Sequence, residues 1–364
     1  MLKPLLAITM GDPAGVGPET IVGAWTSPRV HRWSRPLVVG HPEIIEAAIR
    51  LLGNRLKLVE IDSPEEAEPS PGVIPCLRSG NDSALNVQPG EMCAAAGQAA
   101  YDALVLAANL ALSGRIDAIT TAPLCKQSLH MAGKKYPGHT ELLAELCGVP
   151  EVAMMLYLAP DKDIRSPAGL GVVHVTLHSA LRDVFAQLDE NAILAKARLA
   201  AEVFGRLLKD RAPRIGVCAL NPHGGEGGLF GEEERTIIRP AVERGLAEGL
   251  NLVGPLPTDT LMVAARDGHY DAVVAMYHDQ GHIALKLLGF HRAVNITLGL
   301  PIVRTSVAHG TAFDLAWQGR AQASSMIEAV RVAGLLARQR AGVASDFGEV
   351  SDVEQGELTQ EAEV

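Results

Sequence analysis

Residues 271–314 read DAVVAMYHDQGHIALKLLGFHRAVNITLGLPIVRTSVAHGTAFD. The opening run, Ala272 to Tyr277, is apolar, which predicts a strand buried on both faces of a parallel sheet. His278 and Asp279 follow at the point where that strand would end. Because ligands of open α/β sheets bind outside the carboxyl ends of the strands, this stretch predicts both the fold class and a functional site.

The same pattern recurs further along the stretch. A second apolar run, Ala293 to Thr297, is followed by a Gly-Pro turn and then by polar residues. Lys286, Asn295 and Arg304 lie within or just after apolar segments, where an unpaired charge or polar group is costly unless a ligand, ion or opposite charge compensates it. A single histidine after a strand is commonly structural, so the prediction of a site rests on the whole cluster.

The composition favours a two-domain α/β protein. A chain of 364 residues exceeds the usual size of one core, and 36 glycines with only 4% aromatic residues suit α/β packing with many turns. Residues 5–61 show a strand, helix and strand rhythm, with strands predicted at Leu5–Met10, Pro36–Gly40 and Leu56–Ile61. Residues 63–83 are rich in Pro, Glu and Ser and are predicted to be a surface connection.

The charge balance makes nucleic acid an unlikely class of partner, because 32 basic residues face 42 acidic ones and form no basic stripe. Residues 346–364 hold seven acidic residues and no Lys or Arg, and are predicted to be a disordered acidic tail. Without that tail the net charge is about −3, which permits a positive pocket for an anionic substrate.

Five scattered cysteines without a CxxC pair favour a reduced, cytoplasmic compartment. The apolar segment near the N-terminus is too short for a signal peptide, and no run of 18 apolar residues follows, so no membrane association is expected.

Two turns near predicted strand ends are candidates for anion binding. The glycine-rich turn Gly11–Glu19 matches neither GxGxxG nor the P-loop, and both direct ligand contact and a tight strand-to-helix turn remain open for it. Lys126 and the basic loop Gly133–Glu141 precede predicted helices, and Thr140 with Glu141 resembles an N-cap region, where free N–H groups bind anions.

Three histidines, His178, His223 and His278, each follow a predicted buried strand. Three neutral imidazoles with an open coordination position make a catalytic divalent-metal site, and such ligands are normally distant in sequence. Polar residues also collect at strand ends without any shared function, so coincidence is the alternative. Imidazole ligands do not distinguish Zn, Mg, Mn, Co or Ni here.

The motifs together resemble the 4-hydroxythreonine-4-phosphate dehydrogenase family of vitamin B6 biosynthesis, or its close paralogues, the 4-phospho-D-threonate and D-erythronate-4-phosphate dehydrogenases. The matching segments are TMGDPAGVGPE, TAPLCK, YPGHTE, NPHGGEGG, GPLPTDTL, YHDQGHIALK and VNITLGLPIVRTSVAHGT. This resemblance implies an isocitrate/isopropylmalate dehydrogenase-like α/β fold, with two α/β domains and a cleft between them. It also implies a homodimer in which the second subunit completes the active site.

The resemblance assigns roles to individual residues. Metal ligands would be His178, His223 and His278. Substrate-binding residues would be His139, Thr140, Lys286, Asn295 and Arg304. The loop His309, Gly310, Thr311, Ala312 and Asp314 is similar to the segment that grips the adenosine half of NAD (or NADP). Candidates for the catalytic base are Asp259, Asp279 and Lys286. The family commonly has Asp where Ala308 stands in this sequence.

The implied domains are residues 1–127 with 275–345, carrying the NAD-binding loop, and residues 128–274, carrying substrate, metal and dimer contacts. The predicted reaction is NAD-dependent and metal-dependent oxidation with decarboxylation of 4-hydroxythreonine 4-phosphate to 3-amino-2-oxopropyl phosphate. Two other classes stay open: an acyl-phosphate transferase, on fold analogy, and a non-catalytic sugar-phosphate binding protein.

Overall fold

The computed structural model describes residues 3–208 and 210–342, which form two compact units. The first unit comprises residues 1–154 and 291–338, and the second comprises residues 155–290 with the described residues from Gln339. The predicted boundaries, after residues 127 and 274, differ from this division. Leu142 and Leu143 pack in the core of the first unit, and the helix that begins at His278 packs on strands of the second. The predicted acidic tail lies outside the described residues.

The first unit is built on a mostly parallel set of strands. Its strands, in spatial order, are β3 (Lys57–Ile61), β4 (Val73–Arg78), β2 (Arg35–Gly40), β1 (Leu5–Thr9), β5 (Ala118–Thr121), β12 (Val303–Val307) and β11 (Val294–Leu298). The pair β11–β12 is antiparallel, and the other pairs are parallel.

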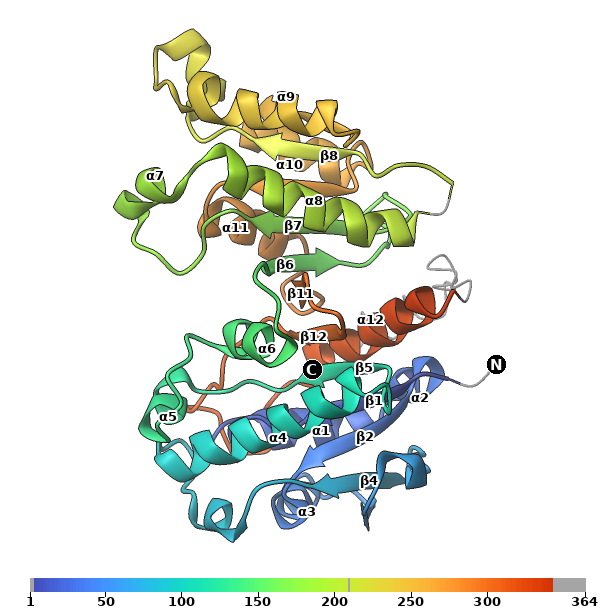
Figure 1. Ribbon diagram of the computed structural model, residues 1–364. Coiled ribbons are helices and arrows are strands. Elements are labelled where there is room, and N and C mark those ends of the chain that lie inside the picture. Colours follow the sequence, from blue (N-terminus) through green and yellow to red (C-terminus); the bar gives the residue numbers. More distant parts are fainter. Residues whose placement is uncertain (1–2, 209, 343–364) are drawn as a thin grey trace. The chain divides into compact units, whose positions relative to one another are not determined.

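Helices cover both faces of this sheet, as Figure 1 shows, so its central strands are apolar on both sides. Along β1, Leu6 and Ile8 face one core and Leu5 and Ala7 face the other. The first core is closed by α1 (Gly17–Trp25), α3 (Pro42–Leu51) and α12 (Ser324–Arg340). The second is closed by α4 (Ala94–Leu112) and α6 (His139–Cys147). The shorter helices α2 (Pro28–Trp33) and α5 (Lys126–Met131) complete this unit.

Helix α4 is the one described helix that is long and apolar enough to cross a membrane. Its face with Ala103, Leu104 and Ala107 is buried against β1, β2 and β5, which explains its apolar composition as that of a core helix.

The strands of the second unit lie in the sheet order β6 (Ala153–Leu158), β7 (Leu170–His174), β10 (Ala272–Ala275), β8 (Ile215–Cys218) and β9 (Leu252–Leu256). Strands β6 and β7 are antiparallel and the rest are parallel. Helices α8 (Glu190–Leu207) and α9 (Arg239–Ala247) pack on this sheet or its edge, as do α10 (Thr258–Arg266) and α11 (His278–Gly289). A short helix, α7 (Val184–Gln187), precedes α8.

Strand β7 shows how this unit is layered. A side chain at Gly171 would meet Phe204 of α8. Val172 and His174, which point to the other face of the strand, border Gly281 of α11. Successive strand residues point to opposite faces, so α8 and α11 lie on opposite sides of β7.

Two segments differ from the sequence-based expectation. Residues 63–83 contain β4, whose Ile74, Pro75 and Cys76 are buried, so the prediction of a surface connection was wrong for that part. Arg304, predicted in the polar cluster that follows the turn after residues 293–297, lies inside β12.

Candidate functional site

Arg304 is the centre of a polar cluster in the first unit. Its side chain is buried, with only 2% of the residue exposed. Its guanidinium donates to the hydroxyl oxygens of Thr297 (2.9 Å) and Thr121 (2.7 Å). Among the described residues, no carboxylate forms an ion pair with it. A guanidinium held by neutral acceptors keeps its positive charge available to an anion.

Asn295 lies on the same sheet face as Arg304. Asn295 pairs across the antiparallel ladder with Ser306, which is two residues from Arg304 on β12. Thr297 is two residues from Asn295 on β11, so it lies on the same face. Asn295 Oδ1 and Arg304 Nε are buried and have no hydrogen-bond partner. Buried polar atoms are nearly always paired, so these two indicate a place where a ligand binds.

His139 and Thr140 begin α6 and are partly exposed. The pKa of His139 lies well below its usual value, first because the imidazole is enclosed and then because the positive charges of Arg304 and Lys126 oppose its protonation. His139 is therefore neutral near pH 7, and it offers a hydrogen bond instead of a charge. Lys126 begins α5 after β5, so the structure brings these predicted residues close to Arg304.

Burial lowers the pKa of Arg304 to about 9, and Glu141 partly opposes this effect. The group stays protonated at neutral pH. A protonated guanidinium with no ion-pair partner among the described residues is a candidate anion site, because a phosphate or carboxylate would supply the missing negative charge.

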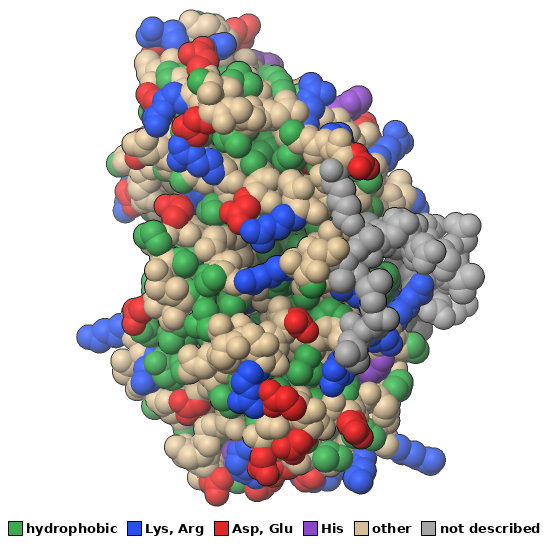
Figure 2. Space-filling model, turned by 45° about the vertical axis from the view of Figure 1, so that its right-hand side comes forward, with side chains coloured by type: hydrophobic (Ala, Val, Ile, Leu, Met, Phe, Trp, Pro, Cys, Tyr) green, Lys and Arg blue, Asp and Glu red, His purple; other side chains and the backbone are tan. Residues whose placement is uncertain are grey.

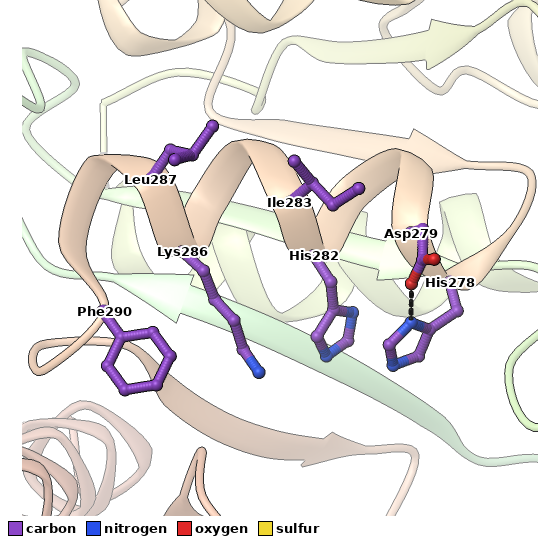
Figure 3. Close-up of a pocket in the computed structure, with 7 residues that line it drawn as sticks. All are labelled: His278, Asp279, His282, Ile283, Lys286, Leu287 and Phe290. Carbon is purple, nitrogen blue, oxygen red and sulfur yellow. Dashed lines mark hydrogen bonds and ion pairs between the residues drawn. The ribbon is translucent and has the colours of Figure 1, made fainter.

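The second unit presents a row of side chains on α11. His278, His282, Lys286 and Phe290 recur every four residues and line a pocket together with Asp279, Ile283 and Leu287. Figure 3 shows the two imidazoles and the Lys286 ammonium on one side of the helix, with Ile283 and Leu287 on the other. Spacing by four residues places side chains on one helical face, which explains the row.

Each imidazole in this row has a neighbour that fixes it. Asp279 Oδ1 lies 2.7 Å from His278 Nδ1, which leaves Nε2 of His278 for another partner. The rings of His278 and His282 stack at 3.8 Å, and Nδ1 of His282 lies 3.1 Å from Nε2 of His174. A carboxylate on one ring nitrogen is the usual support of a histidine that binds metal through the other.

The three predicted metal ligands are only partly brought together. The rings of His178 and His278 are 6.3 Å apart, and His223 lies beside Phe230, also with 6.3 Å between the rings. Within residues 3–208 and 210–342, no group of three His, Cys, Asp or Glu side chains is arranged to hold a metal ion. The donor types suit a divalent ion, but their arrangement in one chain does not form a ligand set.

His223 occupies a strained turn. It has φ 54°, and the next four residues also have positive φ, including Glu226 at 42°. Glu234 holds this turn from behind, because its Oε1 accepts hydrogen bonds from the backbone N–H groups of Leu220 (2.8 Å) and Asn221 (2.7 Å). Strain of this kind persists where the surroundings enforce it, which is common at functional sites.

The three candidate bases have different surroundings. Asp279 is engaged with His278, and Asp259 accepts a hydrogen bond from the N–H of Thr260 in the first turn of α10. Lys286 forms no described ion pair, and its Nζ lies 5.6 Å from the centre of the Phe290 ring. Lys286 is therefore the candidate whose hydrogen-bonding capacity is least committed.

The predicted cofactor loop, residues 309–314, follows β12 in the first unit. His309 Nε2 is buried without a hydrogen-bond partner, a Cβ at Gly310 would meet no atom within 4 Å, and Ala312 has φ 42°. Asp314 is exposed, and the carbonyl of Thr311 accepts a hydrogen bond from the N–H of Val16 (3.0 Å). A free ring nitrogen beside open space fits a ligand with hydrogen-bonding groups, as a nicotinamide dinucleotide has.

Charges on the visible surface are mixed. Figure 2 shows Lys and Arg side chains interspersed with Asp and Glu on the face that it displays, with no continuous basic stripe.

Comparison with known proteins gives consistent matches. Residues 32–333 match the model of the family described as "Pyridoxal phosphate biosynthetic protein PdxA". A D-threonate 4-phosphate dehydrogenase from Cupriavidus necator is 47% identical over 340 residues, which cover 93% of this chain and 98% of that protein. A 4-hydroxythreonine-4-phosphate dehydrogenase from Trichlorobacter lovleyi is 46% identical over 341 residues, covering 93% and 99%.

Solved structures agree with these matches. A 4-hydroxythreonine-4-phosphate dehydrogenase from Klebsiella pneumoniae superposes with a TM-score of 0.82 at 42% identity, covering 92% of this chain and 99% of that one. The EutD phosphotransacetylase from Staphylococcus aureus reaches a TM-score of 0.50 at 12% identity, a likeness of fold alone.

Proposed function

Because the chain belongs to the PdxA family of pyridoxal phosphate biosynthetic proteins, we propose that it oxidises and decarboxylates 4-hydroxythreonine 4-phosphate to 3-amino-2-oxopropyl phosphate in vitamin B6 biosynthesis. It is an oxidoreductase that acts on a CH–OH group, as its dehydrogenase relatives are. The observation that carries the choice of a phosphorylated substrate is the buried, unpaired guanidinium of Arg304.

The first unit binds the anionic substrate. Arg304 supplies the charge, and Asn295, His139 and Thr140 supply hydrogen bonds that orient the substrate. The threonine partners hold the guanidinium in place before the substrate arrives, so little reorganisation is needed on binding. Arginine is the side chain best suited to bidentate recognition of phosphate or carboxylate.

Residues 309–314 hold the adenosine half of the cofactor in this proposal, through the His309 ring nitrogen, the open backbone at Gly310 and the Asp314 carboxylate. The bound nicotinamide supplies the acceptor for the hydride that leaves the substrate carbon.

The acid–base group in this proposal lies on α11. Lys286 is the side chain on the histidine face of α11 whose polar atom has no described hydrogen bond or ion pair, so we assign to its neutral amine form the acceptance of the hydroxyl proton during oxidation, which makes it an ammonium. After the carboxyl group leaves as carbon dioxide, the same ammonium returns a proton to the carbon that carried it. Asp279 acts indirectly by orienting His278.

The three histidines do not form a ligand set within one chain, so no step here passes through a metal ion. We propose that the enzyme is a homodimer and that a second copy completes a divalent-metal site. Large exposed apolar side chains follow each predicted ligand within twelve residues: Leu181 and Phe185, Leu229 and Phe230, and Ile283, Leu287 and Phe290. Apolar side chains gathered around a site favour a protein interface there.

The alternative substrate is D-threonate 4-phosphate or D-erythronate 4-phosphate. The Cupriavidus relative supports it, and so does Ala308, because Asp at that position would be suited to an ammonium group on the substrate. The two substrates differ at the second carbon, which carries an amino group in one and a hydroxyl group in the other.

The test is NADH absorbance with the three phosphorylated compounds and their dephosphorylated forms, at fixed NAD and divalent metal. We expect loss of the phosphate to lower kcat/KM by about 30-fold to several thousand-fold. Equal rates with and without phosphate would overturn the anion site. A strong preference for the threonate or erythronate ester would place the enzyme in sugar-acid catabolism.

A matched pair of variants isolates the effect of Ala308. Ala308→Asp and Ala308→Asn add side chains of equal size, and only the first adds a charge. We compare the kcat/KM for the amino substrate divided by the kcat/KM for the hydroxy substrates. We expect this ratio to be higher in Ala308→Asp than in Ala308→Asn. An identical ratio in both variants would remove position 308 from the explanation.

A further inference from the structure

The glycine-rich turn Gly11–Glu19 contacts the segment that carries the predicted cofactor loop, which we call the 309–319 loop. The N–H of Val16 donates to the carbonyl of Thr311 (3.0 Å), and the indole N–H of Trp317 donates to the carbonyl of Pro13 (2.8 Å). A Cβ on Gly15 would lie 2.8 Å from the Thr311 oxygen, so glycine is needed for this close approach. The turn therefore binds protein backbone along much of its length.

Glu19 makes the strongest of these contacts. It is 1% exposed and lies in the first turn of α1, where the helix dipole favours a carboxylate. Its Oε2 accepts a hydrogen bond from the N–H of Trp317 (2.5 Å), and its Oε1 accepts one from the N–H of Gly319 (2.7 Å). Among the described residues, no Lys, Arg or His forms an ion pair with Glu19, so the loop backbone is what satisfies its charge.

The 309–319 loop needs such support. Ala312 (φ 42°) and Trp317 (φ 59°) both adopt the left-handed region, which is unfavourable for residues with a Cβ. A loop with two strained residues relaxes unless neighbouring groups hold it. Glu19 holds the loop after residues 309–314, and Val16 holds it at Thr311.

We propose that Glu19 is a positioning residue for the nicotinamide cofactor, which keeps the 309–319 loop in the conformation that receives the adenosine half. This inference rests on the proposed function of residues 309–314. The measured dissociation constant equals the intrinsic one divided by the fraction of molecules in the competent conformation, so releasing the loop weakens binding without changing any group that touches the cofactor. The glycine-rich turn then acts on the ligand through the loop.

The experiment compares Glu19→Gln with Asp117→Asn. Both replace a carboxylate that accepts backbone N–H groups in the first unit, since Asp117 Oδ2 accepts from the N–H of Leu5 (2.7 Å). The amide of Gln keeps one acceptor and turns a donor toward the second N–H. Hydrogen exchange of the 309–319 segment is measured without cofactor, and binding of NAD, ADP-ribose and nicotinamide mononucleotide is measured by calorimetry.

We expect Glu19→Gln to speed exchange at the amides of Trp317 and Gly319 and to weaken NAD and ADP-ribose by the same factor, about tenfold to a hundredfold. Nicotinamide mononucleotide, which lacks the adenosine half, keeps its affinity. KM for NAD rises, whereas kcat at saturating NAD changes little. Asp117→Asn changes none of these. Trp317→Phe, which removes only the indole donor, gives a smaller change in the same direction and serves if Glu19→Gln does not fold.

Unchanged exchange in the loop, or faster exchange with unchanged affinity for NAD, overturns the proposal. A purely structural role would lower the melting temperature and leave the NAD and ADP-ribose constants as they are, which also overturns it. If the wild-type enzyme binds neither NAD nor ADP-ribose, the proposed function itself fails, and that result appears before any variant is made.

Discussion

Replacing Arg304 by Met is expected to stabilise the protein while it destroys substrate binding. The guanidinium is buried, and its pKa falls from 12.5 to about 9 because of that burial. A shift of this size corresponds to a cost of roughly 5 kcal/mol for keeping the charge inside. Met has a similar length and no charge, so the substitution removes this cost.

The gain is reduced by the partners left behind. Thr121 and Thr297 lose their hydrogen bonds to the charged guanidinium, at about 1.5 kcal/mol each. The net stabilisation is then about 2 kcal/mol, which for a unit of this size raises Tm by roughly 4–8 °C. Loss of the charged contact to the substrate lowers kcat/KM by about 30-fold to several thousand-fold.

The matched control is Arg331→Met on α12. Arg331 is also buried, at 6% exposure, but it is paired with Glu328, so its removal leaves that buried carboxylate with Arg29 as its remaining described ion-pair partner and is expected to lower the stability of the protein. Activity should not change in this variant. Thermal unfolding and steady-state kinetics measure both properties. If Arg304→Met lowers Tm as Arg331→Met does and leaves kcat/KM unchanged, Arg304 is a structural residue and the anion site is wrong.

Three further predictions concern the pH dependence of substrate binding, the dimer interface and the metal ligands. The KM for the phosphorylated substrate is expected to be flat from about pH 7, where the phosphate is already a dianion, to about pH 9. Above pH 9 it rises by about tenfold per pH unit, because the bound anion favours protonated Arg304 and the free group loses its proton near pH 9. A KM that stays flat to about pH 10 would contradict this. Leu287 is 83% exposed, and Leu287→Asp is expected to yield monomers in analytical ultracentrifugation. The control Leu246→Asp, on α9 at 50% exposure, is expected to leave the dimer intact. Equal behaviour of the two variants would argue against an interface at α11. His223→Ala and His278→Ala are each expected to lose bound metal and activity. If the ligands come from opposite subunits, a heterodimer of the two variants regains part of the metal binding and part of the activity. No recovery would indicate a self-contained site.

The strands that sequence predicted best are those with continuous apolar runs, such as β1 and β10, because burial on both faces leaves a simple pattern. The α/β class and the family are confirmed by the fold and by the relatives. Strand β4 was missed because Pro75 interrupts its short apolar run and the flanking residues are polar. Its neighbours β2 and β3 are not adjacent to each other, which no local pattern reveals.

The site residues divide in the same way. Arg304 was predicted because a charge within an apolar stretch is conspicuous, but its threonine partners come from other strands, and Thr121 is 183 residues away. The contact of Glu19 with Trp317 spans 298 residues, so the sequence could not separate a ligand-binding turn from one that holds a loop. Such partners are set by the order of strands in the sheet. The roles of the predicted metal ligands and of the cofactor loop stay predictions.

Two further histidines lie near the predicted metal ligand His278, namely His174 and His282, and they contact each other. His174 ends β7 and is buried, and its Nε2 lies 3.1 Å from Nδ1 of His282, so the two rings share a hydrogen bond across the β7–α11 contact. Gly281 makes room for this pair, since a Cβ there would lie 2.6 Å from the same ring nitrogen. Burial, followed by the positive charges of His278 and Lys286, lowers the pKa of His282 to about 4, which keeps its ring neutral at physiological pH. A neutral ring stacked at 3.8 Å on His278 fixes that imidazole from the side, while Asp279 fixes it through Nδ1. His174 and His282 therefore do not replace His178 in the predicted set of metal ligands. Both support the orientation of His278 and leave its Nε2 as the atom available for coordination.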